Sequence, residues 1–250
     1  MSAAGADPNG LAGRLIVRET PAQLAETAAE LIARAAASAV DAHGWFAIAL
    51  TGGRTPLLLY ASLTRPPWRD SIRWETWRVY FGDERACPPD NAASNYHAAR
   101  TALLDHVPVA ATHVHRMPAD AADLDAAARS YEAELVHDLP RGPRDAPRFD
   151  CVLLGLGENG HTASLFPGTP ALTVADRWVT RGRADYAPYE RLTLTFPTLN
   201  AAALVAFLVT GASKQAALRS TAAGETPASR VRPSDGALVW LLDSAAAGFT

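Results

Sequence analysis

Short apolar runs alternate with segments of helical periodicity along almost the whole chain, and this alternation limits the folds that the chain can adopt. The runs are bounded by glycine, proline or polar residues, as expected of strands. Strands that alternate with helices predict an α/β fold, with a mostly parallel sheet and helices on both faces. The predicted strands are Leu15–Val17, Trp45–Leu50, Arg78–Phe81, Cys151–Leu154, Leu192–Phe196, Leu204–Val209 and Ala237–Leu242.

Three longer segments have the spacing of amphipathic helices. The first begins at Thr20–Gln23, where a threonine cap is followed by proline and, three residues after the cap, by glutamine; it ends at Gly44. The other two are expected over about Ala121–His137 and over Ser213–Ala222.

The chain has neither an internal repeat nor a linker long enough to divide it. We therefore expect one α/β domain over residues 14–250, within which the Pro- and Trp-rich loop Thr64–Trp74 is an excursion. Residues 1–13 are rich in alanine and glycine and are expected to form a disordered tail.

Composition excludes several classes of protein. Of the 250 residues, 48% are apolar and 20% are charged, which is ordinary for a globular protein and excludes wholesale disorder. The formal net charge is −3 and no basic run is present, so we expect neither nucleic acid nor a membrane surface as a partner. Any anionic ligand must therefore be held by a local site.

The two cysteines, Cys87 and Cys151, are too few for a disulfide scaffold and have no metal-ligand spacing, so no metal and no cofactor is expected. The first residues lack the charged start and apolar middle of a signal peptide. No stretch is apolar over the length that a membrane span needs. We expect a cytoplasmic protein.

Ligands of open parallel sheets bind beyond the carboxyl ends of the strands, where this chain carries the segment Thr51–Pro56. Gly52 and Gly53 let backbone N–H groups approach a ligand closely, and Thr55 is expected to cap the helix that follows. The free N–H groups of a helix N-terminus, together with the guanidinium of Arg54, favour phosphate binding. A tight turn that merely requires glycine and a cap is the alternative.

A second polar segment, Phe81-Gly82-Asp83-Glu84-Arg85, closes the next predicted strand. Arg85 can hold a carboxylate or a phosphate with two hydrogen bonds. The following Ser94-Asn95-Tyr96 is suited to cap a helix that folds over the same edge. A solvated loop is the alternative interpretation.

The third segment, Gly155 to Ser164, contains a formal Gly-x-Gly-x-x-Gly pattern, which is typical of dinucleotide-binding proteins. That function needs a long helix after the last glycine, whereas Pro167-Gly168 leaves room for barely two turns. The segment is better interpreted as a turn that places His161 at the sheet edge, where a near-neutral pKa suits a general base. Since no Gly-x-Ser-x-Gly elbow is present, cap or turn duty is the preferred interpretation of Ser164.

Taken together, these motifs occur in the order seen in 6-phosphogluconolactonases, which the chain resembles from about Arg14 to Asp243. The block around His161 is the most specific element of the resemblance. The motifs are Gly52-Gly53-Arg54-Thr55-Pro56, Phe81 to Arg85, Ser94-Asn95-Tyr96, Gly160 to Gly168, Arg191 to Thr195 and Gly211-Ala212-Ser213-Lys214.

The resemblance implies a Rossmann-like fold, shared with glucosamine-6-phosphate deaminases, and metal-independent hydrolysis of 6-phosphoglucono-1,5-lactone in the pentose phosphate pathway. It also implies that His161 is the general base and that Asn159 and Arg85 act beside it. A further set of residues, given at the end of this paragraph, is expected to bind the substrate. A monomer or small homo-oligomer is expected, with a sugar-phosphate lactone as its ligand. The expected substrate-binding residues are Gly52, Gly53, Arg54, Thr55, Asp83, Arg191 and Lys214.

Asn159 departs from the family pattern, which usually has aspartate two residues before the histidine. An amide in place of a carboxylate is expected to change the tautomer preference of His161 and to lower its basicity. Glu158, Asp83 or Glu84 is a candidate to supply the missing charge.

Two rival functions remain open. A sugar-phosphate deaminase or isomerase of the same superfamily is disfavoured because Leu165-Phe166-Pro167 stands where those enzymes typically carry Asn-Glu-Pro. A sugar-phosphate sensor that kept the anion site and lost the chemistry is the second rival, and Asn159 is its motivation.

Overall fold

Six strands form one parallel sheet in the order β1-β9-β8-β5-β2-β3 in the computed structural model, which describes residues 10–248. The inner strands are buried on both faces because their side chains are apolar throughout, as in the run Leu-Val-Ala-Phe-Leu-Val of β8. The strands are β1 (Arg14–Arg18), β2 (Phe46–Leu50), β3 (Trp77–Phe81), β5 (Cys151–Leu154), β8 (Leu204–Val209) and β9 (Ala237–Asp243). The predicted α/β fold with a mostly parallel sheet is confirmed.

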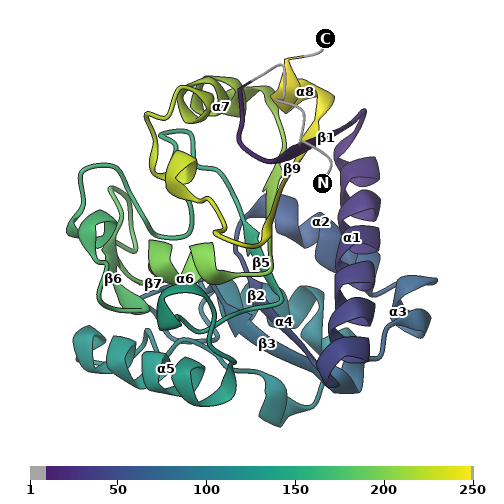
Figure 1. Cartoon of the computed structure of the whole chain (residues 1–250), viewed down its shortest axis with the longest axis horizontal. Helices are drawn as coiled ribbons and strands as arrows, with labels where there is room; N and C mark the ends of the chain where they lie inside the picture. Colours follow the sequence, from purple (N-terminus) through teal and green to yellow (C-terminus); the bar gives the residue numbers. More distant parts are fainter. Residues whose placement is uncertain (1–9, 249–250) are drawn as a thin grey trace.

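Helices cover both sides of this sheet (Figure 1). In that view α1 (Pro21–His43) and α2 (Arg54–Leu63) lie to the right of the strands, whereas α5 (Leu124–Asp138) and α6 (Phe196–Ala201) lie to the left. The predicted capping box of α1 is present: Thr20 Oγ1 accepts from Gln23 N at 3.2 Å, and Gln23 Oε1 accepts from Thr20 N at 3.3 Å. The remaining helices are α3 (Trp68–Ser71), α4 (Asn95–Ala102), α7 (Gln215–Ala222) and α8 (Ser244–Ala247).

A second sheet of three antiparallel strands lies beside the first, in the order β4 (Asp83–Arg85), β7 (Glu190–Leu194) and β6 (Val179–Arg183). The sequence prediction of a strand over Leu192–Phe196 is wrong at its carboxyl end, because Phe196-Pro197 begins α6. The observed strand also belongs to the antiparallel sheet, in keeping with its alternation of leucine with threonine and arginine.

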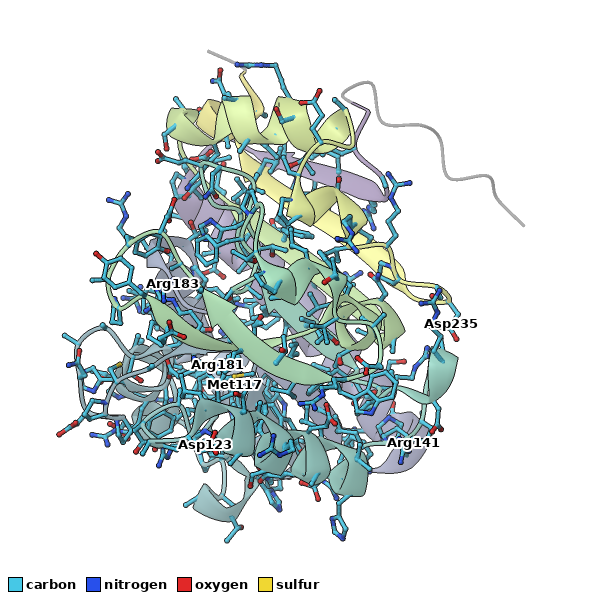
Figure 2. All side chains as sticks on the ribbon, turned by 90° about the vertical axis from the view of Figure 1, so that its left-hand side faces the viewer. Met117, Asp123, Arg141, Arg181, Arg183 and Asp235 are labelled. Carbon is cyan, nitrogen blue, oxygen red and sulfur yellow. The ribbon has the colours of Figure 1, made fainter. Side chains whose placement is uncertain are left out.

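Arg181 and Arg183 lie on the face of the second sheet that Figure 2 turns toward the viewer, and one ion pair of Arg181 joins this sheet to α5. Arg181 Nη1 lies 3.2 Å from Asp125 Oδ2, and Arg181 Nη2 lies 3.1 Å from Glu190 Oε2. Arg183 also pairs with Glu190. Because these side chains are largely exposed, the pairs are expected to add little to the stability of the fold.

The predicted tail over residues 1–13 falls partly outside the described residues. Two of its last four residues pack against the domain. Leu11 is buried in the core, with 6% of its surface exposed, and Ala12 O accepts a hydrogen bond from Trp240 Nε1 at 3.0 Å. Ordered chain therefore begins earlier than expected. Between residues 10 and 248, no helix combines the length and the apolar character needed to cross a membrane.

Candidate active site

A cleft of about 430 Å³ lies at the carboxyl ends of the parallel strands. The segments that follow β2, β3, β5 and β8, together with the last residue of β9, all contribute to its lining, as expected for an open α/β sheet. The polar and glycine residues of the lining include Gly52, Gly53, Arg54, Thr55, Asp83, Arg85, Asn95, His161, Arg191, Thr210, Lys214 and Asp243.

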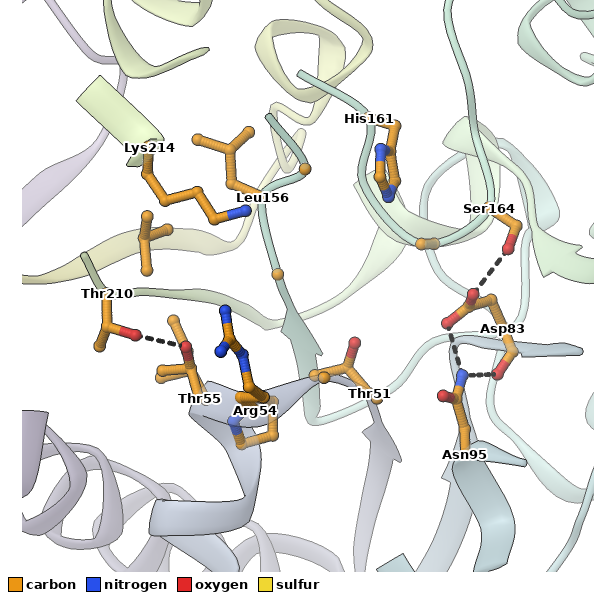
Figure 3. A pocket seen from close by; sticks show the side chains of 18 of the residues that line it. Thr51, Arg54, Thr55, Asp83, Asn95, Leu156, His161, Ser164, Thr210 and Lys214 are labelled. Atoms are coloured by element: carbon orange, nitrogen blue, oxygen red, sulfur yellow. Dashed lines mark hydrogen bonds between the residues drawn. The ribbon is translucent and has the colours of Figure 1, made fainter. Parts of the chain in front are cut away.

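One end of the cleft is cationic and is built on the start of α2. Arg54, the first residue of α2, and Lys214 both line this end, and Figure 3 shows their side chains extending toward each other. Lys214 Nζ is 4.0 Å from Glu158 Oε1, and no ion pair is found for Arg54 within the described residues. Two cations beside free backbone N–H groups form an environment suited to a phosphate group.

The predicted cap of α2 is wrong. The helix begins at Arg54, its N-cap is Gly53 with φ of 104°, and no side chain caps it. Thr55 instead lies inside the first turn, where its Oγ1 is 2.7 Å from Thr210 Oγ1 at the end of β8. The backbone N–H groups of the first turn are therefore free of a side-chain cap, which leaves them available to a ligand.

A buried polar network forms the opposite wall of the cleft (Figure 3). Asp83 Oδ2 accepts from Ser164 Oγ at 2.6 Å, and Asp83 Oδ1 accepts from Asn95 Nδ2 at 3.1 Å. A Cβ on Gly52 would lie 1.7 Å from Asn95 Oδ1, so only glycine fits there. Ser164 donates its hydroxyl to Asp83 rather than to His161, and this contact between distant segments is neither the cap nor the turn contact that the sequence analysis preferred.

Glu84 anchors α4 to the edge of the sheet and is itself removed from the cleft. Its buried carboxylate accepts from the backbone N–H groups of Arg85, Asn95 and Tyr96 at 2.7–2.8 Å and from the Ser94 hydroxyl at 2.9 Å. Burial raises the pKa of Glu84, and these hydrogen bonds oppose that rise. Ser94 caps α4 as predicted, with Oγ accepting from His97 N at 3.1 Å.

His161 stands in the glycine-rich turn after β5, without any helix behind it. Its backbone O accepts from Gly157 N at 2.8 Å, and Thr162 Oγ1 donates to Gly155 O at 2.9 Å, so the turn is closed on both sides of the histidine. A Cβ on Gly157 would lie 2.0 Å from His161 Nδ1, so the glycine makes room for the imidazole. The ring stacks on Phe166, with 4.0 Å between the centroids.

Asn159 fixes the tautomer of His161. Its Oδ1 accepts from the backbone N–H of His161 at 3.2 Å and lies 2.6 Å from Nδ1. Because an oxygen only accepts, Nδ1 must carry the proton, and Nε2 then has a free lone pair. Burial lowers the pKa of His161 to about 4; Lys214 and Arg191 add to the shift, and Asp83 and Asp185 oppose it. The imidazole is neutral at pH 7.

Arg191 and Arg85 lie opposite each other on β7 and β4, near the histidine. Arg191 is 1% exposed, and its Nη1 has no hydrogen-bond partner among the described residues. Burial, followed by repulsion from Arg85, lowers the pKa of Arg191. Arg85 donates to Ala93 O. A buried cation with an unsatisfied donor needs an anion or a polarised oxygen in the cleft.

The structure thus brings together nine of the ten predicted site residues in one cleft; the tenth, Asn159, reaches it through His161. Of the candidates to replace the aspartate charge, Glu84 is committed to α4, and the Glu158 side chain is 69% exposed beside Lys214. Sequence reasoning missed Tyr186, Phe166, Thr210 and Asp243 as lining residues. Thr210 and Asp243 each come directly after a predicted strand, so the strand-end rule could have found both, and Phe166 lies within the motif Gly160 to Gly168; Tyr186 carried no such signal.

A group of metal-ligating side chains lies outside this cleft. His115, Glu134 and Asp138 bring their ligand atoms within 4.8 Å of one another. His115 Nδ1 is 2.6 Å from Glu134 Oε1 and 3.7 Å from Asp138 Oδ2, and a hydrogen bond between His115 and Glu134 accounts for the shorter distance. None of the three lines the cleft.

Comparison with known proteins decides the family. Residues 19–240 match the family described as glucosamine-6-phosphate isomerases/6-phosphogluconolactonase. The chain belongs to this family. A 6-phosphogluconolactonase from Synechocystis sp. is 46% identical over 213 residues, which cover 83% of this chain and 86% of the relative. A probable 6-phosphogluconolactonase 2 from Oryza sativa is 35% identical, covering 92% and 87%.

Solved structures of the family share the fold. The 6-phosphogluconolactonase of Trypanosoma brucei matches with a TM-score of 0.83 and 30% identity, over 95% of this chain and 98% of that one. A monomeric glucosamine-6-phosphate deaminase matches with a TM-score of 0.79 at 22% identity, which shows a common fold only. The three proteins described above that are at least 30% identical to this chain all bear the 6-phosphogluconolactonase name.

Proposed function

We propose that this protein hydrolyses 6-phosphoglucono-1,5-lactone to 6-phosphogluconate in the pentose phosphate pathway, with His161 as the general base. The observation that carries the proposal is the contact of His161 Nδ1 with Asn159 Oδ1, which leaves Nε2 free to accept a proton inside a cleft with cations at both ends. The names of the relatives support the substrate.

The reaction needs no covalent nucleophile, because a lactone is an activated ester. His161 Nε2 takes a proton from water while the water oxygen bonds to the lactone carbonyl carbon. The resulting oxyanion needs donors, and the unpartnered Nη1 of Arg191, with Arg85 opposite, supports assigning it to this wall. Cleavage of the bond to the ring oxygen then returns the proton from the imidazolium to that oxygen, giving the acid product.

The phosphate group belongs at the other end of the cleft in this proposal. Arg54, Lys214 and the uncapped first turn of α2 offer charge and N–H donors there, well separated from the Asp83 carboxylate in Figure 3. Binding energy gained at the phosphate then orients the lactone carbonyl toward His161.

In this proposal Asn159 orients the imidazole of His161, as the aspartate at this position is expected to do in other members of the family. Its oxygen holds the Nδ1–H tautomer, so the orientation of the base is kept. Without the negative charge the imidazolium is less stabilised, which agrees with a low pKa for His161 and predicts a weaker base that stays deprotonated at low pH.

The deciding experiment measures hydrolysis of the lactone above its spontaneous opening by the wild-type protein and by His161→Ala. Acceleration by wild type that is lost in the variant supports the proposal. A wild-type protein that binds 6-phosphogluconate without accelerating hydrolysis would identify the sensor. Release of ammonia from glucosamine 6-phosphate would identify the deaminase.

A further inference from the structure

We infer that Tyr186 is a substrate-binding residue that forms the aromatic wall of the cleft and packs against the carbon skeleton that the lactone and the open-chain 6-phosphogluconate share. The inference deepens the proposed function and rests on it. It assigns a specificity contact to the β6–β7 turn, which carries none of the family motifs found in the sequence.

Tyr186 stands over the reacting end of the cleft although it belongs to the second sheet. Its ring centroid is 6.5 Å from that of His161 and 5.9 Å from that of Phe166, on which His161 is stacked. The guanidinium of Arg191 lies 5.3 Å from the Tyr186 ring. The tyrosine therefore contacts the surroundings of both the base and the buried cation.

The turn that carries Tyr186 is held at its base. Ala184 N donates to Tyr189 O at 2.8 Å, which closes the turn, and Ala184 is 4% exposed. The Tyr186 side chain is nevertheless 47% exposed. A large ring that is held beside a polar cleft while half of it remains in water has apolar surface to offer a ligand.

No other aromatic side chain is in a position to make this contact among the described residues that line the cleft. Besides Tyr186, the lining has Phe166, which is 3% exposed beneath the imidazole, and His161, which is the base. The cationic end of the cleft suits a phosphate, whereas the carbon-bound hydrogens of the sugar skeleton are better matched by an apolar surface. Pockets for such ligands combine a few oriented polar groups with aromatic side chains.

Tyr189 provides a matched control from the same turn. It is 50% exposed, and its ring lies 5.9 Å from the guanidinium of Arg183, which does not line the cleft. Replacement of either tyrosine by alanine therefore removes a similar exposed surface and one cation contact, but only Tyr186 lines the cleft.

The test compares wild type with Tyr186→Ala, Tyr186→Phe and Tyr189→Ala. We expect Tyr186→Ala to raise both KM for the lactone and Kd for 6-phosphogluconate about tenfold, as expected when one aromatic contact is lost. Its kcat should stay within about threefold, because the base and the cations remain. Tyr186→Phe should keep KM and Kd within about twofold of wild type, and Tyr189→Ala should be unchanged.

Two results would overturn the inference while leaving the proposed function intact. The first is that Tyr186→Ala and Tyr189→Ala have equal Kd and equal KM values. The second is that Tyr186→Phe is as impaired as Tyr186→Ala, which would assign the effect to the hydroxyl. Calorimetric Kd values for 6-phosphogluconate decide the point even if wild type does not hydrolyse the lactone, an outcome that would defeat the proposed function alone. A wild-type protein that does not bind 6-phosphogluconate would defeat both. Tyr186→Leu serves as a second variant if Tyr186→Ala unfolds.

Discussion

Asn159 Oδ1 lies 2.6 Å from Nδ1 of His161 and also accepts from the backbone N–H of the same residue. One amide oxygen thus fixes both the position and the tautomer of the imidazole without placing a charge beside it. The two effects that a carboxylate would combine, orientation and charge, are separated in this protein. The pH dependence of catalysis can distinguish them.

Replacement of His161 by alanine is expected to lower kcat by about 10²–10⁴-fold, the usual contribution of a general base. Binding of 6-phosphogluconate should change by only a few fold, because the cations are untouched. Steady-state kinetics and calorimetry measure the two effects. His43→Ala, at the end of α1, removes a remote histidine and should leave both unchanged. Full activity of His161→Ala would refute the mechanism.

Replacement of Asn159 by aspartate is expected to move the acid limb of the kcat/KM profile to higher pH. In wild type the active, neutral form of His161 is present at pH 7 and is lost as the pH falls through about 4. A carboxylate beside Nδ1 stabilises the imidazolium and should raise the limb by about one to two pH units. Asn159→Ala, which removes the oxygen, should lower kcat without that upward shift. An unchanged profile for Asn159→Asp would show that position 159 does not tune the base.

The two ends of the cleft should respond differently to the loss of a cation. Arg54→Ala and Lys214→Ala are expected to raise KM about tenfold or more with little change in kcat, because phosphate contacts persist from ground state to transition state. Inhibition by inorganic phosphate should weaken in parallel. Arg191→Met should instead lower kcat by about 10²-fold, since an oxyanion donor acts in the transition state. Arg183→Ala, whose side chain is 66% exposed, is the matched control. If the Arg54 and Lys214 variants instead lowered kcat and the Arg191 variant raised KM, the phosphate and oxyanion sites would have to be exchanged.

Glu84→Gln is expected to destabilise the fold by about 2–4 kcal/mol, because the new amide NH₂ faces N–H donors that the carboxylate now accepts. Denaturant unfolding measures the change, and Glu75→Gln, on the surface, should be neutral within about 0.5 kcal/mol. Stability equal to wild type would mean that water replaces the lost bonds at the start of α4.

The sequence predicted the parallel sheet well because its strands are short, wholly apolar and bounded by glycine or polar residues. It did not predict β4 and β6, since Asp83-Glu84-Arg85 has no apolar side chain and Val179–Arg183 has only one large one; pairing with β7 makes them strands. Tyr186 was missed with them, because its place over His161 depends on that pairing. The single domain, the cytoplasmic location, the oligomeric state and the absence of nucleic-acid partners stay predictions.

The strand-end rule predicted where Gly52, Asp83 and His161 would meet, because parallel strands end at one edge. The contacts within the cleft depend on side-chain packing that no spacing reveals. The partner of Ser164, the role of Glu84 and the free Nη1 of Arg191 are of this kind.

The cleft draws on the carboxyl ends of strands from β2, near the start of the chain, to β9, whose last residue Asp243 accepts from Gly211 N at 3.0 Å and so holds the turn before Lys214. β9 is also inserted between β1 and β8. Assembly of the cleft is therefore coupled to the docking of β9 in the middle of the sheet. A substitution that loosens β9 is expected to release the turn before Lys214 as well, and so to weaken substrate binding from a distance.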